Sequence, residues 1–288
     1  MCDEQTYLPK GYPYLLRIEG ICKLSGLKIA VSGKGGVGKT TLAGTLCRLF
    51  AKDGRKVLAV DADPSMNLYT ALGIETTAIN KIHPISEMAD LIEERTGAKP
   101  GTSGGIFVVN PKVSDIPDRF SVLGPDGVKL LVMGSTKPAG TGCFCPENAL
   151  IRTLVAHVIL DRSEIVIMDM EAGVEHLTRG TAKSVDLMLI VVEPGQRSIE
   201  LAETIKRLSI GLGIKRVFFV ANKVRSDNEE KFVTESTKKA KADLLGIIHY
   251  DDAANLADRE GKAVLDIAPD SAIIKEIKIV KANINKLY

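Results

Sequence analysis

Gly33-Lys34-Gly35-Gly36-Val37-Gly38-Lys39-Thr40-Thr41 is the stretch that decides the fold of this chain. It matches the phosphate-loop spacing G-x4-G-K-[ST]. The apolar run Leu27–Val31 precedes it and the stretch Leu42–Phe50 follows it, so the loop lies between a predicted strand and a predicted helix. The free N–H groups at the start of such a helix, and the helix dipole, favour a bound anion. The stretch therefore predicts a P-loop domain that binds the phosphates of a nucleotide.

Each residue type in this loop has a physical task. Glycines let the backbone turn tightly and direct its N–H groups at phosphate oxygens. Lys39 is expected to reach the β- and γ-phosphates, and the Thr40 hydroxyl to ligate Mg²⁺. Lys34 is a second lysine, which the bare pattern does not require. The loop residues expected to bind ATP or ADP are Gly35, Gly36, Val37, Gly38, Lys39, Thr40 and Thr41.

Composition describes an ordinary globular protein and excludes several classes. The chain has 288 residues, 45% of them apolar and 26% charged, with a net charge of +2. This charge gives no global attraction to nucleic acid or to an anionic membrane. No apolar run is long enough to span a bilayer, and the acidic N-terminus lacks the apolar core of a signal peptide. Five scattered cysteines predict reduced thiols in a cytoplasmic protein.

Short apolar runs alternate with longer amphipathic stretches, which is typical of a parallel sheet covered by helices. The predicted strands are Leu27–Ser32, Lys56–Asp61, Ile106–Val109, Lys129–Met133, Glu164–Asp169, Leu187–Glu193, Arg216–Ala221 and Leu245–His249. The predicted helices are Thr40–Asp53, Ile85–Thr96, Glu147–Ser163, Ser198–Leu212, Glu229–Asp243 and Ala253–Ala263. The pattern predicts an α/β fold: one doubly wound, mostly parallel P-loop NTPase domain over residues 27–288, with helices on both faces. Residues 1–26 form an N-terminal extension with no assignable function.

Acidic residues follow two of the predicted strands. Asp61 and Asp63 follow the second strand, and Asp169 ends the strand that begins at Glu164. Carboxylates beside a phosphate loop hold Mg²⁺ or its waters, or orient an attacking water. A single acid at a strand end more often caps a helix or faces solvent. Two such strands favour the functional interpretation.

Asn222-Lys223 follows a later strand at the same edge of the sheet. The Asn amide can pair with the adenine edge, and the Lys stem can pack along the ring. Asn is also a common turn former. We expect a base contact.

Cys143-Phe144-Cys145 supplies two thiols close together, which suits Zn²⁺, Ni²⁺ or Cu⁺. One chain is short of ligands, whereas a symmetric dimer would bring four thiolates together. The alternative is a pair of reduced or reversibly oxidised thiols. The spacing alone leaves both interpretations open.

The last stretch carries apolar residues at helical spacing, with several lysines among them. A basic amphipathic helix can lie on a membrane, but this one lacks Trp and Phe anchors. We expect its apolar face to dock on the parent domain. The apolar positions are Ile273, Ile277, Val280, Ile284 and Leu287.

The loop GKGGVGKTT resembles the deviant Walker A motif of dimeric ATPases that include the nitrogenase iron protein and the Min and Par ATPases. The resemblance implies that Lys34 reaches the nucleotide of the partner subunit and that Asp63 helps activate water. It implies that Asp61 and Asp169 associate with Mg²⁺ and that Gly173 belongs to the γ-phosphate-sensing switch.

A closer resemblance is to CooC-type proteins, the ATPases that assist nickel insertion into carbon monoxide dehydrogenase. It is carried by GCFCPENALIR (residues 142–152), DMEAGVEHLTRGT (169–181) and VVEPGQRSIE (191–200). It implies that Cys143 and Cys145 of two subunits bind one metal ion, Ni²⁺ or Zn²⁺, in an ATP-promoted homodimer. The implied client is carbon monoxide dehydrogenase or acetyl-CoA synthase.

Two rival functions remain. A Min/Par-like positioning ATPase that cycles on membrane or DNA would use the C-terminal helix, but it leaves Cys143 and Cys145 unexplained. An electron carrier like the nitrogenase iron protein would need an iron–sulfur cluster, which a single C-x-C pair fits poorly.

Overall fold

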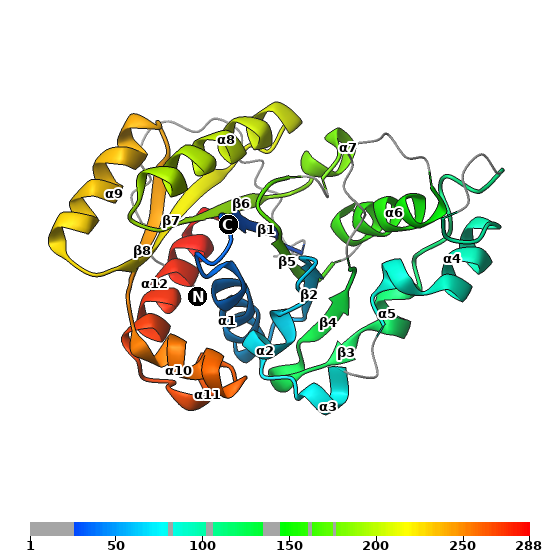
Figure 1. The fold of residues 1–288 in the computed structure, drawn as a ribbon, viewed down its shortest axis with the longest axis horizontal. Helices are drawn as coiled ribbons and strands as arrows, with labels where there is room; N and C mark the ends of the chain where they lie inside the picture. The colour runs from blue at the N-terminus through cyan, green and yellow to red at the C-terminus, as the bar shows by residue number, and fades with distance from the viewer. Residues whose placement is uncertain (1–25, 80–82, 102–105, 135–144, 161–162, 175–176) are drawn as a thin grey trace, which may run out of the picture.

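An eight-stranded sheet forms the centre of the protein, in the order β3-β4-β2-β5-β1-β6-β7-β8 (Figure 1). The computed structural model describes residues 26–79, 83–101, 106–134, 145–160, 163–174 and 177–288. Neighbouring strands are parallel, except that β3 runs antiparallel to β4. The strands are β1 (Lys28–Gly33), β2 (Val57–Ala62), β3 (Val122–Leu123), β4 (Lys129–Val132), β5 (Ile165–Met170), β6 (Leu187–Val192), β7 (Val217–Val224) and β8 (Asp243–His249). The predicted doubly wound, mostly parallel sheet is confirmed.

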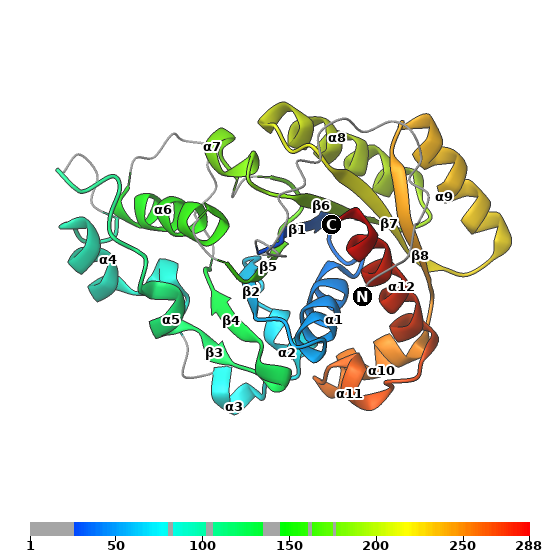
Figure 2. The same cartoon turned by 180° about the vertical axis from the view of Figure 1, so that it is seen from behind.

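Helices cover both faces of the sheet, as Figures 1 and 2 show from opposite sides. One face carries α1 (Lys39–Lys52), α2 (Leu68–Leu72), α10 (Asp252–Glu260), α11 (Val264–Ile267) and α12 (Ala272–Leu287). The other carries α4 (Ala89–Thr96), α5 (Ile116–Phe120), α6 (Pro146–Leu160), α7 (Arg179–Ala182), α8 (Gln196–Leu212) and α9 (Asp227–Lys239). The short elements α3 (Thr76–Ile79), η1 (Ile85–Glu87) and η2 (Pro125–Gly127) complete the chain order.

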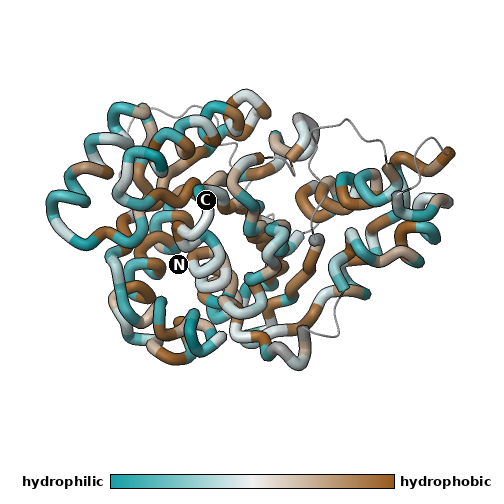
Figure 3. Tube along the Cα trace, viewed as in Figure 1, coloured by the Kyte–Doolittle hydropathy of each residue, from teal (hydrophilic) through white to brown (hydrophobic). Residues whose placement is uncertain are grey.

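Two hydrophobic cores lie on the two faces of the sheet, and the strands contribute to both in turn. Along β1, Ile29 and Val31 pack into the α1 side, and Ala30 packs into the α6 side. Successive side chains of a strand point to opposite faces. Because helices cover both faces of the sheet, successive residues of the central strands are apolar. These strands are largely brown in Figure 3.

Two expectations about strands are wrong. Residues 106–109 form no strand, and the Ile106 side chain is fully exposed. An apolar run without a neighbouring strand has nothing to pair with, so β-propensity alone did not decide its structure. The edge strand β3 was missed because two residues are too few to produce a pattern.

Some predicted boundaries also move. The helix expected over residues 229–243 is α9, which ends at Lys239, and Asp243 already begins β8. The stretch 85–96 divides into η1 and α4. Strand β7 runs on to Val224, so Asn222-Lys223 lies inside the strand, at an irregularity in the pairing with β8, and not after it.

The C-terminal helix α12 docks on the domain as predicted. Ile273, Ile277, Val280 and Ile284 are buried against β8 and α1. None of the helices in the described ranges is long and apolar enough to cross a membrane. The predicted extension, residues 1–26, lies outside the described residues except for Gly26.

Candidate nucleotide-binding site

The phosphate loop joins β1 to α1 at the carboxyl end of the central strand, and two of its glycines are structurally required. Gly33 has φ 146°, and a Cβ there would lie 2.4 Å from the Val191 carbonyl oxygen of β6. Gly38 has φ 95°, and a Cβ there would lie 2.3 Å from the Asn222 amide nitrogen. Larger residues would therefore push the loop away from β6 at Gly33 and away from the Asn222 side chain of β7 at Gly38. Gly35 and Gly36 are exposed, as a loop that receives a ligand must be.

The two lysines of the loop are both engaged. Lys39 is 6% exposed, and its Nζ donates to the Lys34 carbonyl oxygen at 3.3 Å. Lys34 places its Nζ 3.2 Å from the Glu193 carboxylate, which directly follows β6. The side chains of this ion pair are 42% and 30% exposed. Thr41 lies in the first turn of α1 beside Thr40.

Sheet register brings the two predicted magnesium acids together. Asp61 on β2 and Asp169 on β5 are paired residues in neighbouring parallel strands, and each is 1% exposed. The Asp169 carboxylate accepts a hydrogen bond of 2.6 Å from the Thr40 hydroxyl. Its other oxygen, Oδ1, is buried with no hydrogen-bond partner. Thr40, Asp61 and Asp169 thus lie in one group, as the sequence predicts.

Both buried carboxylates are harder to ionise than usual. Burial, followed by the neighbouring Asp61 charge, raises the pKa of Asp169 to about 7, against the opposing hydrogen bond from Thr40. Burial also raises the pKa of Asp61 to about 6, although two backbone N–H groups stabilise its charge. Those donors are Leu68 at 2.9 Å and Asp63 at 3.2 Å. A pair of acids with raised pKa beside a phosphate loop is typical of a functional site.

Asp63 has a different environment from the two buried acids. It is half-buried, and its Oδ1 accepts bonds from the backbone N–H of Ser65, at 2.9 Å, and from the Ser65 hydroxyl. Its water-activating role stays a prediction.

Asn222 and Lys223 contact the phosphate loop directly. The buried Asn222 amide donates to the Val37 carbonyl oxygen at 2.7 Å, and Lys223 Nζ donates to the Gly36 carbonyl oxygen at 2.6 Å. Lys223 has φ 60°, the left-handed conformation that redirects its side chain over the loop. Their adenine contacts stay a prediction.

Of the predicted metal ligands, Cys145 lies directly before α6 and is 8% exposed, and Cys143 lies outside the described residues. Within the described ranges no group of three or more His, Cys, Asp or Glu residues is arranged to hold a metal ion. Cys47 is fully buried in the core under α1, and burial raises the pKa of its thiol.

Sequence reasoning from the residues did not single out Glu193 as the partner of Lys34. The signal was present, because Glu193 directly follows a buried strand, and Asp61 and Asp169 are the last but one residues of two other buried strands.

Comparison with known proteins agrees with this geometry. Residues 28–264 match the CobQ/CobB/MinD/ParA nucleotide binding domain. The chain belongs to this family. It is a P-loop ATPase with the phosphate loop, buried acids and sheet order described above.

Among relatives, the chain is 46% identical over 243 residues to the carbon monoxide dehydrogenase accessory protein CooC of Rhodospirillum rubrum, covering 84% of this chain and 91% of that protein. It is 46% identical over 262 residues to an uncharacterized ATP-binding protein of Methanocaldococcus jannaschii, covering 91% and 98% of the two chains. Among solved structures, a ParA family ATPase from Chlorobium tepidum superposes with a TM-score of 0.66 at 19% identity, over 90% of this chain and 98% of that one. The last likeness concerns the fold alone.

Proposed function

We propose that this ATPase is a dimeric metallochaperone. Two copies close on ATP, their C-x-C pairs together bind one Ni²⁺ or Zn²⁺ ion as cargo, and ATP hydrolysis releases the ion to maturing carbon monoxide dehydrogenase or acetyl-CoA synthase. The observation that carries the proposal is the 46% identity to a carbon monoxide dehydrogenase accessory protein over 91% of its length. The cysteine pair in this chain supplies the matching chemistry.

The nucleotide half of the site follows from the loop. The N–H groups of Gly35–Thr41 surround the phosphates, and Lys39 exchanges the Lys34 carbonyl for phosphate oxygens. Asn222 and Lys223, which lie against the loop, contact the base. Asp63 orients the attacking water.

The donor set beside the loop fits Mg²⁺. A hard cation prefers oxygen ligands, and Thr40 and Asp169 present a hydroxyl and a buried carboxylate oxygen without a partner. Asp61, whose oxygens already accept backbone N–H groups, would act through water bound to the cation. Bound Mg²⁺ would neutralise charge on the phosphates.

Lys34 connects nucleotide binding to dimerisation. Its ion pair with Glu193 is substantially exposed to solvent, and such pairs contribute about 1 kcal/mol or less. The lysine is therefore easily released, and a second copy would offer it the phosphates of a bound nucleotide.

The thiolate site for the transported metal ion requires two chains. Two cysteines in one chain leave a thiolate site incomplete, whereas two chains supply four ligands. Square-planar geometry would suit Ni²⁺ and tetrahedral geometry Zn²⁺. A site shared across the dimer would then tighten with ATP and loosen after hydrolysis.

The deciding experiment measures metal stoichiometry together with oligomeric state. Equilibrium dialysis against Ni²⁺ or Zn²⁺, with light scattering after size exclusion, is performed without nucleotide, with ADP and with ATP. We expect about one ion per dimer, with dimers favoured by ATP. The double variant Cys143→Ala/Cys145→Ala is expected to lose the ion and keep ATP hydrolysis. Cys47→Ala is the matched control, because that thiol is 0% exposed.

Two results would contradict the proposal. Full metal stoichiometry in the double cysteine variant would remove the C-x-C pair as the binding site. A monomer with ATP, unchanged by Lys34→Ala, would remove the shared site and Lys34 as the interface residue.

A further inference from the structure

The side chain of Ser32 ties the strand of the phosphate loop to the turn Glu171–Gly173. Ser32 is 0% exposed, and its hydroxyl lies 2.9 Å from the Gly173 carbonyl oxygen and 3.1 Å from the Glu171 carbonyl oxygen. The same oxygen accepts the backbone N–H of Gly173 at 3.1 Å. A hydroxyl has one proton and two lone pairs, so this arrangement uses the donor and at least one acceptor of Ser32 on a single turn.

The hydrogen bonds of Ser32 lie next to the nucleotide-binding loop in the chain. Ser32 directly precedes Gly33, the first residue of the phosphate loop. The turn directly follows β5, whose Asp169 accepts a bond from Thr40. Two side chains, Ser32 and Thr40, therefore hydrogen-bond the phosphate-loop segment to the end of β5 and the turn after it.

Mg²⁺·ATP would compete for the Thr40 contact and not for the Ser32 contacts. The hydroxyl at the Thr40 position of a phosphate loop is a Mg²⁺ ligand, so a cation held by Thr40 and Asp169 would replace their direct 2.6 Å contact. Loss of that contact would allow the end of β5 to adjust, whereas the turn that follows β5 would still be held by Ser32. The donor of Gly173 stays occupied by Ser32 for as long as the turn keeps its present position.

The turn, and not the strand that carries Ser32, is the part of this contact that can adjust. Gly173 has φ 151°, in a region of backbone conformation that favours glycine. The strand β1 that carries Ser32 is fixed between β5 and β6 in the middle of the sheet. Any adjustment therefore occurs in the turn, and it breaks the bonds to Ser32.

We propose that Ser32 is a positioning residue that controls ATP binding: its hydroxyl holds the turn Glu171–Gly173 in the nucleotide-free position, and binding of Mg²⁺·ATP releases it. Removing the hydroxyl makes the nucleotide-free arrangement less favourable, because Gly173 loses its partner. The ATP-bound arrangement is unaffected, since the bond is already broken there. The loss of the hydroxyl is thus expected to favour ATP binding.

The test compares Ser32→Ala with the intact chain in steady-state ATP hydrolysis and in binding of a fluorescent ATP analogue with Mg²⁺. We expect the KM for ATP and the half-saturating analogue concentration to fall about fivefold, with kcat unchanged. A net hydrogen bond of about 1 kcal/mol converts to roughly this factor. An effect on KM alone means that the ATP complex and the transition state are stabilised equally, relative to the free protein and free ATP.

Ser209→Ala is the matched control. Ser209 is also 0% exposed, and its hydroxyl donates to the Ile205 carbonyl oxygen at 2.8 Å within α8. A merely structural role of a buried hydroxyl would alter the melting temperature in both variants and the KM in neither. An unchanged or raised KM in Ser32→Ala would overturn the proposal, and so would an equal fall in Ser209→Ala. These outcomes are independent of metal binding and dimerisation.

Discussion

Replacement of Asp169 by Asn is expected to make the nucleotide-free protein more stable at alkaline pH while it abolishes ATP hydrolysis. The carboxylate is 1% exposed, Oδ1 has no hydrogen-bond partner, and Asp61 lies beside it on the neighbouring strand. Without a cation, ionised Asp169 is therefore unfavourable in the folded state. An amide has nearly the same shape, keeps an oxygen for the Thr40 hydroxyl and carries no charge.

The size of the effect follows from the raised pKa. Burial moves the pKa of Asp169 from 3.8 to about 7. The folded state then binds the proton more tightly than the unfolded state, so this group's contribution to stability is fully present below pH 3.8 and is lost as the pH rises through 7. Each pH unit in that window changes the free energy of unfolding by about 1.4 kcal/mol. Between about pH 5 and about pH 8 the native chain therefore loses about 3 kcal/mol that Asp169→Asn keeps.

Urea unfolding without nucleotide or metal, at about pH 5 and about pH 8, measures this difference directly. The unpartnered amide of the variant costs about 1–3 kcal/mol at both pH values. The quantity to compare is therefore the stability of Asp169→Asn minus that of the native chain, at about pH 5 and again at about pH 8. A difference that stays the same at the two pH values would refute the argument that Asp169 is desolvated in the folded protein.

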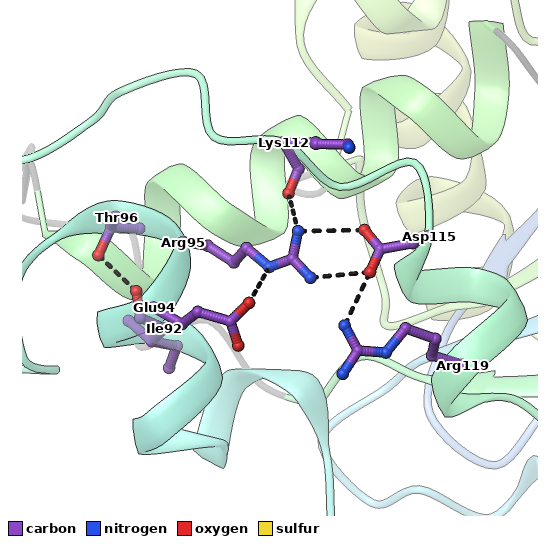
Figure 4. A network of polar contacts seen from close by, with 7 residues as sticks. All are labelled: Ile92, Glu94, Arg95, Thr96, Lys112, Asp115 and Arg119. Atoms are coloured by element: carbon purple, nitrogen blue, oxygen red, sulfur yellow. Dashed lines mark hydrogen bonds and ion pairs between the residues drawn. The ribbon is translucent and has the colours of Figure 1, made fainter.

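Asp115→Asn is the control of opposite sign. Asp115 lies in the polar network of Figure 4, where hydrogen bonds from Arg119 and Arg95 lower the pKa of its carboxyl to about 2. Its contribution is present above pH 3.8 and is lost only as the pH falls through about 2. The stability difference between this variant and the native chain is therefore expected to be the same at about pH 5 and about pH 8.

Three further changes test the packing and the loop. Lys39→Ala is expected to weaken binding of a fluorescent ATP analogue about tenfold or more, because it removes charged hydrogen bonds to phosphate; equal affinity would contradict its assignment. Arg48→Met is expected to lower the free energy of unfolding in urea by about 2 kcal/mol, since the buried guanidinium pairs with Asp126 at 2.7 Å and with Asp266 at 2.6 Å; an unchanged value would mean that these two ion pairs contribute nothing. Gly44→Ala is expected to lower it by about 1–2 kcal/mol, because the new Cβ would lie 2.6 Å from Ala71 Cβ where α1 crosses α2; a more stable variant would show that the helices separate freely.

The fold was predictable from the sequence to the extent that it rests on long, covered strands. β1, β5 and β6 are buried on both faces, so their apolar runs stand out against the amphipathic helices. Residues 106–109 were misread for the same reason, since an apolar run carries no information about whether a partner strand exists. The two residues of β3 pair with β4 through tertiary context alone.

The grouping of the site was predictable from topology, but its bonds were not. Asp61 and Asp169 end strands that happen to be neighbours, and parallel strands bring their carboxyl ends to one edge. The sequence does not show which oxygen of Asp169 lacks a hydrogen-bond partner, because that depends on the positions of individual atoms. The role of Ser32 was hidden because a serine within an apolar strand looks like an interruption of the pattern.

In the nucleotide-free protein, nearly every group prepared for the ligand is already satisfied by another part of the chain. Lys39 donates to the Lys34 carbonyl, Lys34 pairs with Glu193, and the Thr40 hydroxyl donates to Asp169. Binding of nucleotide therefore exchanges partners, and the net free energy is the difference between the charged bonds formed with phosphate and the bonds given up within the chain. The exception is the pair of buried carboxylates, whose pKa values are raised by burial and whose ionised forms are stabilised only in part, Asp169 by the Thr40 hydroxyl and the Lys39 charge and Asp61 by two backbone N–H groups. Because a bound cation would compensate the remaining cost of two buried charges, Asp61 on β2 and Asp169 on β5 should make nucleotide affinity depend on Mg²⁺ more steeply than the phosphate loop alone would.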